Sequence, residues 1–131
     1  MLDTDVCVAI IKADERVHAR LRESVPSQLR MSAITLAELR YGQAKSTQRR
    51  QVASNLRVLL SKVAVVPFDA EAASRYGEVR AALERRGSTI GPHDLLIAAH
   101  ALSLGWRLAT HNLREFTRVP GLHVEDWLAA R

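Results

Sequence analysis

The sequence has very little cysteine: Cys7 is the single one among 131 residues. No disulfide bond can therefore form within the chain, and such a composition is typical of a protein in the reducing cytosol. Zinc sites built from cysteine and histidine are also disfavoured, because the five histidines are scattered and show no metal-ligand spacing with Cys7. A disulfide-rich secreted domain and a zinc module are thus both disfavoured.

The sequence also lacks a hydrophobic run that could cross a membrane. The longest run, LLIAAHALSLGW, is short and contains His100. Near the N-terminus, Asp3 and Asp5 occupy positions where a secretory signal would carry lysines. We therefore expect a cytoplasmic protein with no membrane partner.

Repeats, low-complexity blocks and linker-like stretches are absent as well. A chain of this length can bury one sizeable hydrophobic core, and 47% of its residues are hydrophobic. We expect one globular domain over residues 1–131.

Basic residues outnumber acidic ones by 19 to 14, which gives a formal net charge of +5 and a pI near 10.1. Neutralising the phosphates of a polyanion releases counterions, so a basic surface favours nucleic-acid binding. A well-solvated surface explains the same surplus equally well. The charge alone does not decide between these two explanations.

Short apolar segments alternate with helical patterns along the chain. The predicted strands lie in MLDTDVCVAI, LRMSAI, VAVVPF, WRLAT and LHVED. We expect VAVVPF to be a buried strand that Pro67 stops, and the apolar helix between Pro92 and Gly105 to be central. This alternation predicts an α/β fold with a mainly parallel central sheet flanked by helices.

Polar side chains follow the predicted strands. Asp3 and Asp5 lie at the end of the first strand, and Glu38 lies in the helix after the second. Asp94 falls in the first turn of the central helix, and Asn112 follows WRLAT. Because ligands gather outside the carboxyl ends of parallel strands, we expect these residues to meet at one edge of the sheet.

Each of these residues also has a purely structural explanation. The two early aspartates are good helix N-caps, and Thr35 with Glu38 matches an S/T-x-x-E capping box. Asp94 suits the positive end of a helix dipole, and Asn112 suits a turn. Only the joint pattern favours a functional site.

Carboxylates packed together need a counter-charge. Without one they raise each other's pKa and tend to protonate. Oxygen-only ligands suit Mg²⁺ or Mn²⁺. Together with a basic surface, this pattern favours metal-assisted hydrolysis of a phosphodiester.

Several stretches that cover most of the chain carry a family resemblance: LDTD, SAITLAELRYG, VVPFDAEAASRYGEVRAALERRG, IGPHDLLIAAHALSLG and LATHNLREFTRVPGLHVEDW. They resemble the PIN-domain ribonucleases, and most closely the VapC-type toxins of bacterial toxin–antitoxin pairs. The resemblance implies a single compact PIN-like domain with an acidic metal pocket that cleaves RNA. It also implies two protein partners, namely a second copy in a homodimer and a cognate VapB-type antitoxin that blocks the pocket.

The resemblance assigns a role to each site residue. Asp3, Glu38 and Asp94 match the three family carboxylates, which would hold the metal directly or through water. Asn112 stands at a fourth position, where the family has Asp or Asn, and would position a ligand water. This asparagine removes one negative charge from an all-carboxylate pocket.

Supporting roles fall to residues beside the four. Asp5 stands where many relatives have Asn and would restore the missing charge from behind the ligands. Thr4 and Thr110 are expected to donate hydrogen bonds to the ligands, although ordinary strand threonines explain them as well. Glu115 is assigned to a helix surface.

Two other functions stay open at this stage. A non-catalytic RNA-binding PIN-like module would use the basic surface alone. The DTDV motif also resembles the haloacid-dehalogenase phosphatases, in which Asp3 would be the nucleophile. Cys7 departs from that motif, and no lysine follows Lys62.

Overall fold

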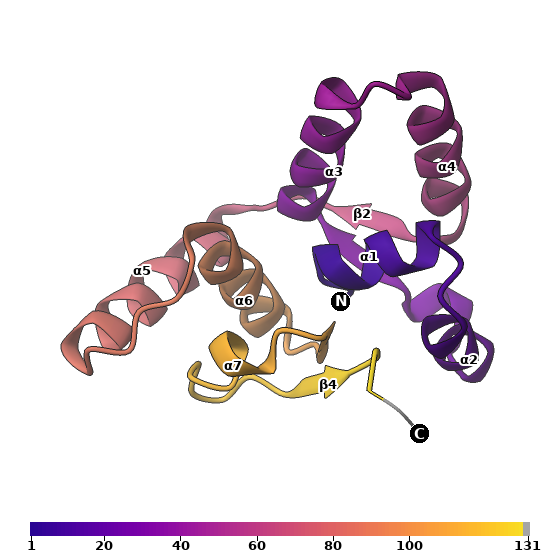
Figure 1. The fold of residues 1–131 in the computed structure, drawn as a ribbon. Coiled ribbons are helices and arrows are strands. Elements are labelled where there is room, and N and C mark those ends of the chain that lie inside the picture. Colours follow the sequence, from indigo (N-terminus) through magenta and orange to yellow (C-terminus); the bar gives the residue numbers. More distant parts are fainter. Residues whose placement is uncertain (130–131) are drawn as a thin grey trace.

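A computed structural model describes residues 1–129 of the chain. Helices and very short strands alternate along it (Figure 1). The predicted domain runs to residue 131, so its last two residues lie outside the described part. No helix within 1–129 combines the length and the apolar character needed to cross a membrane.

The elements occur in the following order: α1 (Thr4–Ile11), α2 (Glu15–Glu23), a 3₁₀ turn (Pro26–Gln28), β1 (Arg30–Ser32), α3 (Ala33–Lys45), α4 (Arg49–Lys62), β2 (Ala64–Val66), α5 (Ala70–Arg85), α6 (Pro92–Leu104), β3 (Leu108–Thr110), α7 (Leu113–Phe116) and β4 (Val124–Asp126).

The strands pair in parallel. β1 pairs with β2, and β3 pairs with β4. Leu2 joins the two pairs, because its N–H donates to the carbonyl of Arg30 at 2.7 Å and it forms a parallel bridge with Ala109. The order across the sheet is therefore β2, β1, the segment around Leu2, β3 and β4. This arrangement confirms the predicted α/β fold with a mainly parallel sheet.

Local signals account for the ends of the central helix α6. Pro92 occupies its first turn, where the missing N–H has no intrahelical partner to lose. Gly105 ends it with a φ of +66°, a left-handed conformation that glycine adopts without strain. Leu95, Ile97 and the residues of 98–101 are buried, so the prediction of a central helix is confirmed.

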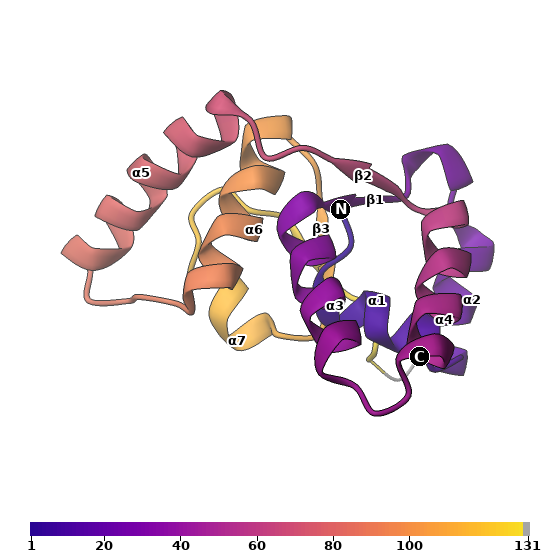
Figure 2. The ribbon, with the colours of Figure 1, turned by 90° about the horizontal axis from the view of Figure 1, so that it is seen from above.

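Two apolar clusters hold the domain together. One joins α1, α2 and α4 with β1, and the other joins α5, α6 and α7 with β3. Figures 1 and 2 show these two groups of helices on opposite sides of the central strands. The sheet is thus covered by helices, and its carboxyl edge lies between the two groups.

The prediction that VAVVPF forms a buried strand is wrong. In β2, Ala64 is exposed and Val65 is 37% exposed. β2 lies at the edge of the sheet, because within residues 1–129 only β1 pairs with it. Apolar, β-branched residues therefore favoured the strand correctly but did not reveal its position in the sheet.

Candidate functional site

The predicted site residues come together at the carboxyl edge of the sheet. Asp3 follows Leu2, and Thr110 is the last residue of β3. Glu38 lies in α3, directly after β1, and Asp94 lies in the first turn of α6. Burial raises the pKa of Asp94 most, and the negative charges of Asp3 and Glu38 raise it further, so these carboxylates lie close enough to act on one another.

Asp3 is held by the backbone on one side and by a hydroxyl on the other. As the N-cap of α1, its Oδ1 accepts the N–H of Thr4 at 2.8 Å. Its Oδ2 accepts the hydroxyl of Thr110 at 2.7 Å. Burial, together with the nearby charge of Asp5, raises the pKa of Asp3 to about 7, and only 4% of the residue is exposed. The capping role and the site role therefore coexist in this residue.

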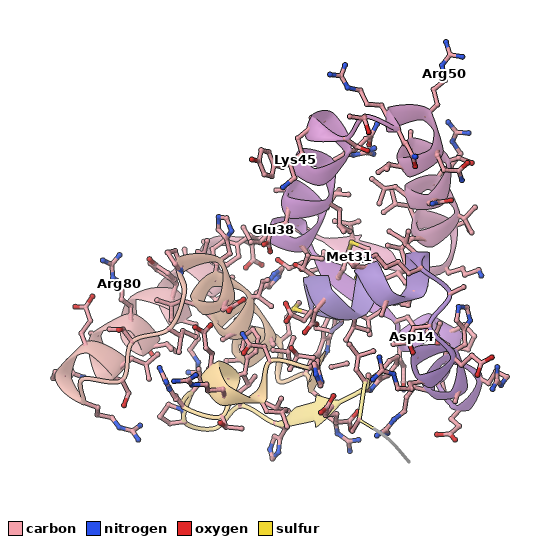
Figure 3. All side chains as sticks on the ribbon, viewed as in Figure 1. Asp14, Met31, Glu38, Lys45, Arg50 and Arg80 are labelled. Atoms are coloured by element: carbon pink, nitrogen blue, oxygen red, sulfur yellow. The ribbon has the colours of Figure 1, made fainter. Side chains whose placement is uncertain are left out.

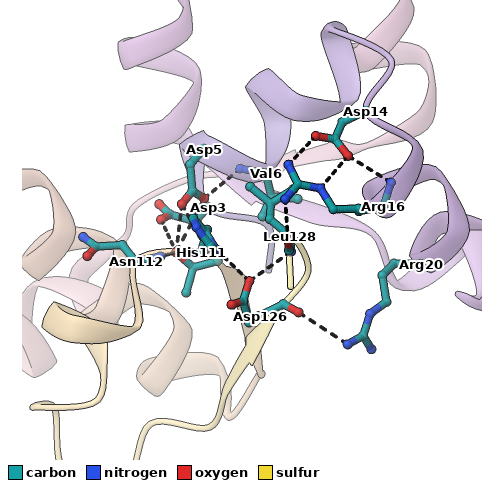
Figure 4. Close-up of polar contacts among 11 residues, drawn as sticks. Asp3, Asp5, Val6, Asp14, Arg16, Arg20, His111, Asn112, Asp126 and Leu128 are labelled. Carbon is teal, nitrogen blue, oxygen red and sulfur yellow. Dashed lines mark hydrogen bonds and ion pairs between the residues drawn. The ribbon is translucent and has the colours of Figure 1, made fainter. Parts of the chain in front are cut away.

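Asp5 lies beside Asp3 and fixes the loop that follows β3 (Figure 4). Its Oδ2 accepts the backbone N–H of His111 at 2.9 Å, and its Oδ1 accepts that of Val6 at 2.7 Å. The hydroxyl of Thr110 lies 3.3 Å from the same Oδ2. Asp5 thus adds a negative charge beside Asp3.

Glu38 is tied to the start of α1. The hydroxyl of Thr4 donates to its Oε1 at 2.8 Å, and Nδ1 of His93 lies 3.5 Å from its Oε2. The capping-box explanation for Glu38 is wrong, because the N-cap of α3 is Ser32, whose hydroxyl accepts the N–H of Ile34. Glu38 therefore has no capping role and lies at the site.

Asp94 is held by side chains that come from the loop after β3. Asn112 donates through Nδ2 to Oδ2 of Asp94 at 3.1 Å and lies 3.3 Å from Oε2 of Glu115. Burial, followed by the hydrogen bond with Glu115, raises the pKa of Asp94 to about 8. The same hydrogen bond holds the pKa of Glu115 below its usual value.

Glu115 therefore belongs to the site, and its assignment to a helix surface is wrong. Its Oε2 also accepts the N–H of Gly91, just before α6, at 3.5 Å. The spacing of Asn112 and Glu115 could have indicated this position, because residues three apart share one side of a helical turn. α7 has only four residues, so this signal is weak.

The donor set is compatible with a hard divalent cation. Oxygen-bearing side chains border the edge, namely those of Asp3, Glu38, Asp94, Asn112 and Glu115. Among residues 1–129, however, no three Asp, Glu, His or Cys side chains converge closely enough to hold a metal ion by themselves. Mg²⁺ is commonly bound by one or two carboxylates with water as its other ligands. The residues therefore fit a hydrated ion better than a closed protein cage.

Comparison with known families identifies the fold. The PIN domain family matches residues 1–122. The chain belongs to this family. The tRNA(fMet)-specific endonuclease VapC of Salmonella typhimurium is 41% identical over 128 residues, which cover 97% of this chain and 96% of that protein. Ribonuclease VapC2 of Rickettsia felis is 41% identical over 129 residues, with 97% and 96% covered.

Solved structures agree with this membership. VapBC2 of Rickettsia felis, bound to a promoter DNA fragment, superimposes on this PIN domain with a TM-score of 0.90 at 38% identity, covering 95% of this chain and 96% of that chain. DNA-bound VapBC of Salmonella typhimurium gives a TM-score of 0.92 at 41% identity, covering 97% and 96%. The chain is thus a VapC-type PIN domain, and the resemblance to haloacid-dehalogenase phosphatases is wrong.

Proposed function

We propose that this chain is a metal-dependent endoribonuclease and the toxin of a type II toxin–antitoxin pair, using Mg²⁺ or Mn²⁺. The observation that carries the proposal is the meeting of Asp3, Glu38 and Asp94 at one sheet edge in a VapC-type chain. Their charges act on each other there, which favours a bound cation.

The roles follow from the contacts of each side chain. Asp3 and Asp94 would hold the cation directly, and Glu38 would hold it directly or through water. Asn112 bonds Oδ2 of Asp94 and so orients this carboxylate, leaving Oδ1 for the ion. When bound, a divalent cation lowers the pKa of the attacking water and neutralises charge on the phosphate.

Other roles concern the proton of the attacking water and the orientation of the carboxylates. Glu38 or Asp94 would take the proton of the attacking water as general base. Thr4 orients Glu38, and Thr110 orients Asp3, each through a hydroxyl that donates to a carboxylate oxygen. Asp5 keeps the Thr110 loop in place through the N–H of His111.

The substrate and the partners are inferred from relatives. Two related VapC proteins, from Salmonella typhimurium and Shigella flexneri, are named tRNA(fMet)-specific endonucleases, so initiator tRNA is the first substrate to test. Solved relatives are toxin–antitoxin complexes, which favours a cognate VapB-type antitoxin as the partner that silences the site. We also propose that the chain forms a homodimer.

Cleavage of purified RNA tests this function. The chain, freed of antitoxin, is incubated with initiator tRNA and with total RNA, with Mg²⁺ or with EDTA, and the cut ends are mapped. We expect cleavage with Mg²⁺ and none in EDTA, and with Mg²⁺ a rate at least about 100-fold lower for Asp94→Asn. Asp69→Asn is the matched control, because Asp69 caps α5 through the N–H of Ala72 and asparagine caps equally well.

The outcome separates catalysis from simple binding. RNA bound with equal affinity by the wild type and by Asp94→Asn, but cut by neither, would make the chain a non-catalytic RNA-binding module. Cleavage that persists undiminished in EDTA would refute the metal-dependent mechanism.

A further inference from the structure

Two of the site carboxylates lie on helices that are joined by polar contacts, Glu38 on α3 and Asp94 on α6. Beside the site, Nδ1 of His93 lies 3.5 Å from Oε2 of Glu38. Farther along α6, Nδ1 of His100 lies 2.8 Å from Oγ of Ser32, the N-cap of α3. Residue numbers rise along α6 as they fall toward Ser32, so the two helices run antiparallel. Figure 3 shows Glu38 on the side of α3 that faces α6.

The contact between His100 and Ser32 is equally far from both carboxylates. Ser32 precedes Glu38 by six residues, and His100 follows Asp94 by six residues within α6. At the rise of an α-helix, each separation is about 9 Å. Because each helix moves as a stiff rod, a contact that fixes α3 against α6 at this level also fixes their spacing at the level of the carboxylates.

This contact is completely enclosed. Ser32 is 0% exposed and His100 is 1% exposed. Oγ of Ser32 accepts the N–H of Ile34 at 3.1 Å, and the buried hydroxyl proton of Ser32 needs an acceptor of its own. Nδ1 of His100 is the acceptor within reach. Burial lowers the pKa of His100 and so favours the neutral ring, which then carries its proton on Nε2.

The ring of His100 is held by two further residues, which follow β2. Phe68 packs against it edge-on, with the ring centroids 5.3 Å apart and the planes at 73°. The backbone of Pro67, which offers a carbonyl but no N–H, also hydrogen-bonds the ring. A buried polar group with all its partners in place is rigid and admits one arrangement. An apolar side chain would fill this space but would not bind Ser32.

We propose that His100 is a positioning residue, which holds α3 through Ser32 at the distance from α6 where Glu38 and Asp94 can share one hydrated cation. The proposal deepens the proposed ribonuclease function and rests on it. His100 does not touch the cation, the RNA or the attacking water. It acts through the spacing of the two helices that carry the ligands.

Two amide substitutions of His100 separate positioning from simple packing. Both remove the ring, but asparagine branches at Cγ as histidine does, so its Oδ1 can take the place of Nδ1 and accept the hydroxyl of Ser32. Glutamine has no acceptor at that position. Glutamine is the better helix former of the two, so a purely structural role predicts that His100→Gln is the less damaging change.

Binding of Mn²⁺ alone, measured by electron paramagnetic resonance without RNA, gives the readout. We expect His100→Gln to weaken Mn²⁺ binding at least about fivefold, somewhat less than the loss of a group that bonds a ligand directly. We expect His100→Asn to stay within about twofold of the wild type, because the acceptor for Ser32 is kept. The order of the two affinities is then opposite to the order that helix propensity sets for their Tm values.

Ser32→Gly tests the same contact from α3. Glycine caps a helix nearly as well as serine but has no hydroxyl, so Mn²⁺ affinity should fall as it does in His100→Gln. Phe68→Leu is the matched control, since it removes the ring that packs on His100 and leaves the hydrogen bond to Ser32. It should lower Tm and leave Mn²⁺ affinity unchanged.

Two results would overturn the positioning role. One is equal Mn²⁺ affinity of His100→Asn and His100→Gln. The other is a loss of affinity in Phe68→Leu as large as that in Ser32→Gly, which would make affinity follow stability. RNA cleavage by the same proteins tests the function separately. Mn²⁺ binding in the expected order without any cleavage refutes the ribonuclease function alone, whereas cleavage by the wild type with equal Mn²⁺ affinity in all variants refutes the positioning role alone.

Discussion

Asp3 and Asp94 lie in the same site but are held in different ways. Asp3 is 4% exposed, and its two oxygens accept the backbone N–H of Thr4 and the buried hydroxyl of Thr110. Asp94 is half-buried, and its described hydrogen-bond partners are the side chains of Asn112 and Glu115. One carboxylate is thus fixed by the sheet and a helix end, and the other by a one-turn helix.

The two carboxylates therefore differ in how firmly the structure holds them. The position of Asp3 is set by the strand segment at Leu2 and by the start of α1, so it moves only with the core. The carboxylate of Asp94 is held by the side chains of Asn112 and Glu115, and in the described residues no backbone group hydrogen-bonds to it. We infer that Asp3 sets the place of the cation and that Asp94 adapts to it.

We call Asp3 and the groups that hold it, Thr4 and Thr110, the rigid half of the site. Replacing Thr110 should have the largest effect on this half. In Thr110→Val the hydroxyl that donates to Asp3 is lost, and so is the acceptor for the N–H of Asn112 at 3.0 Å. We expect cleavage to fall about 10- to 100-fold, as for other groups that orient a metal ligand. We also expect the free energy of unfolding to fall by about 1–3 kcal/mol, because buried polar groups lose their partner. RNA cleavage rates and urea unfolding measure the two effects.

Thr110→Ser is the matched control for this prediction. Serine keeps the hydroxyl and loses only a methyl group, so it should retain most of the cleavage rate. If Thr110→Val cleaves as fast as Thr110→Ser, the hydroxyl does not orient Asp3 and the rigid half is fixed by the backbone alone.

The pH dependence of stability tests the two halves together. The pKa values are about 7 for Asp3 and about 8 for Asp94, both above the ordinary value of 3.8. Asp3 and Asp94 therefore bind more protons in the folded, metal-free chain than in the unfolded chain between about pH 4 and pH 8, and the stability that they contribute falls as pH rises through this window. The terminal amine of Met1 acts in the opposite direction between about pH 6 and pH 8, because burial lowers its pKa to about 6, but it is one group against two. Thermal unfolding in EDTA should give a lower Tm at pH 8 than at pH 5. Mg²⁺ should raise Tm more at pH 8, where both carboxylates are ionised.

Asp94→Asn should flatten this pH dependence and weaken the effect of Mg²⁺. Asp14→Asn is the matched control, since Asp14 lies partly exposed beside Arg16, whose hydrogen bond lowers its pKa to about 2, so it stays ionised throughout the window. Equal stabilisation by Mg²⁺ in the wild type and in Asp94→Asn would exclude Asp94 as a ligand.

The sequence predicted the rigid half of the site better than the adjustable half, which consists of Asp94 with Asn112 and Glu115. Asp3 follows an apolar segment and precedes a helix, and both signals are local. The bounds of α6 were likewise readable, because Pro92 and Gly105 act on the residues next to them. Position in the sheet is not a local property, which is why VAVVPF was placed in the core although β2 forms an edge.

Glu115 was misplaced for a related reason. The one local signal is the spacing of Asn112 and Glu115, and it is weak because α7 has only four residues, so the sequence does not indicate that α7 turns back toward the start of α6. The contact with Gly91 joins residues 24 positions apart and depends on how α6 packs against α7. A part of the site that is held only by side-chain contacts can therefore be predicted only when the tertiary structure is known.

Glu115→Gln should have the smallest effect and acts on the adjustable half. Glutamine still accepts the N–H of Gly91 but carries no charge, so the pKa of Asp94 should fall, because the contact with Glu115 raises it. Asp94 would then ionise at lower pH, and the acid limb of the cleavage profile should move to lower pH, with the maximal rate reduced less than about tenfold. Glu71→Gln, which changes an exposed glutamate in the first turn of α5, should leave the profile unmoved. A loss as large as that of Asp94→Asn would instead make Glu115 a direct ligand of the cation, and the adjustable half would then be held by two carboxylates.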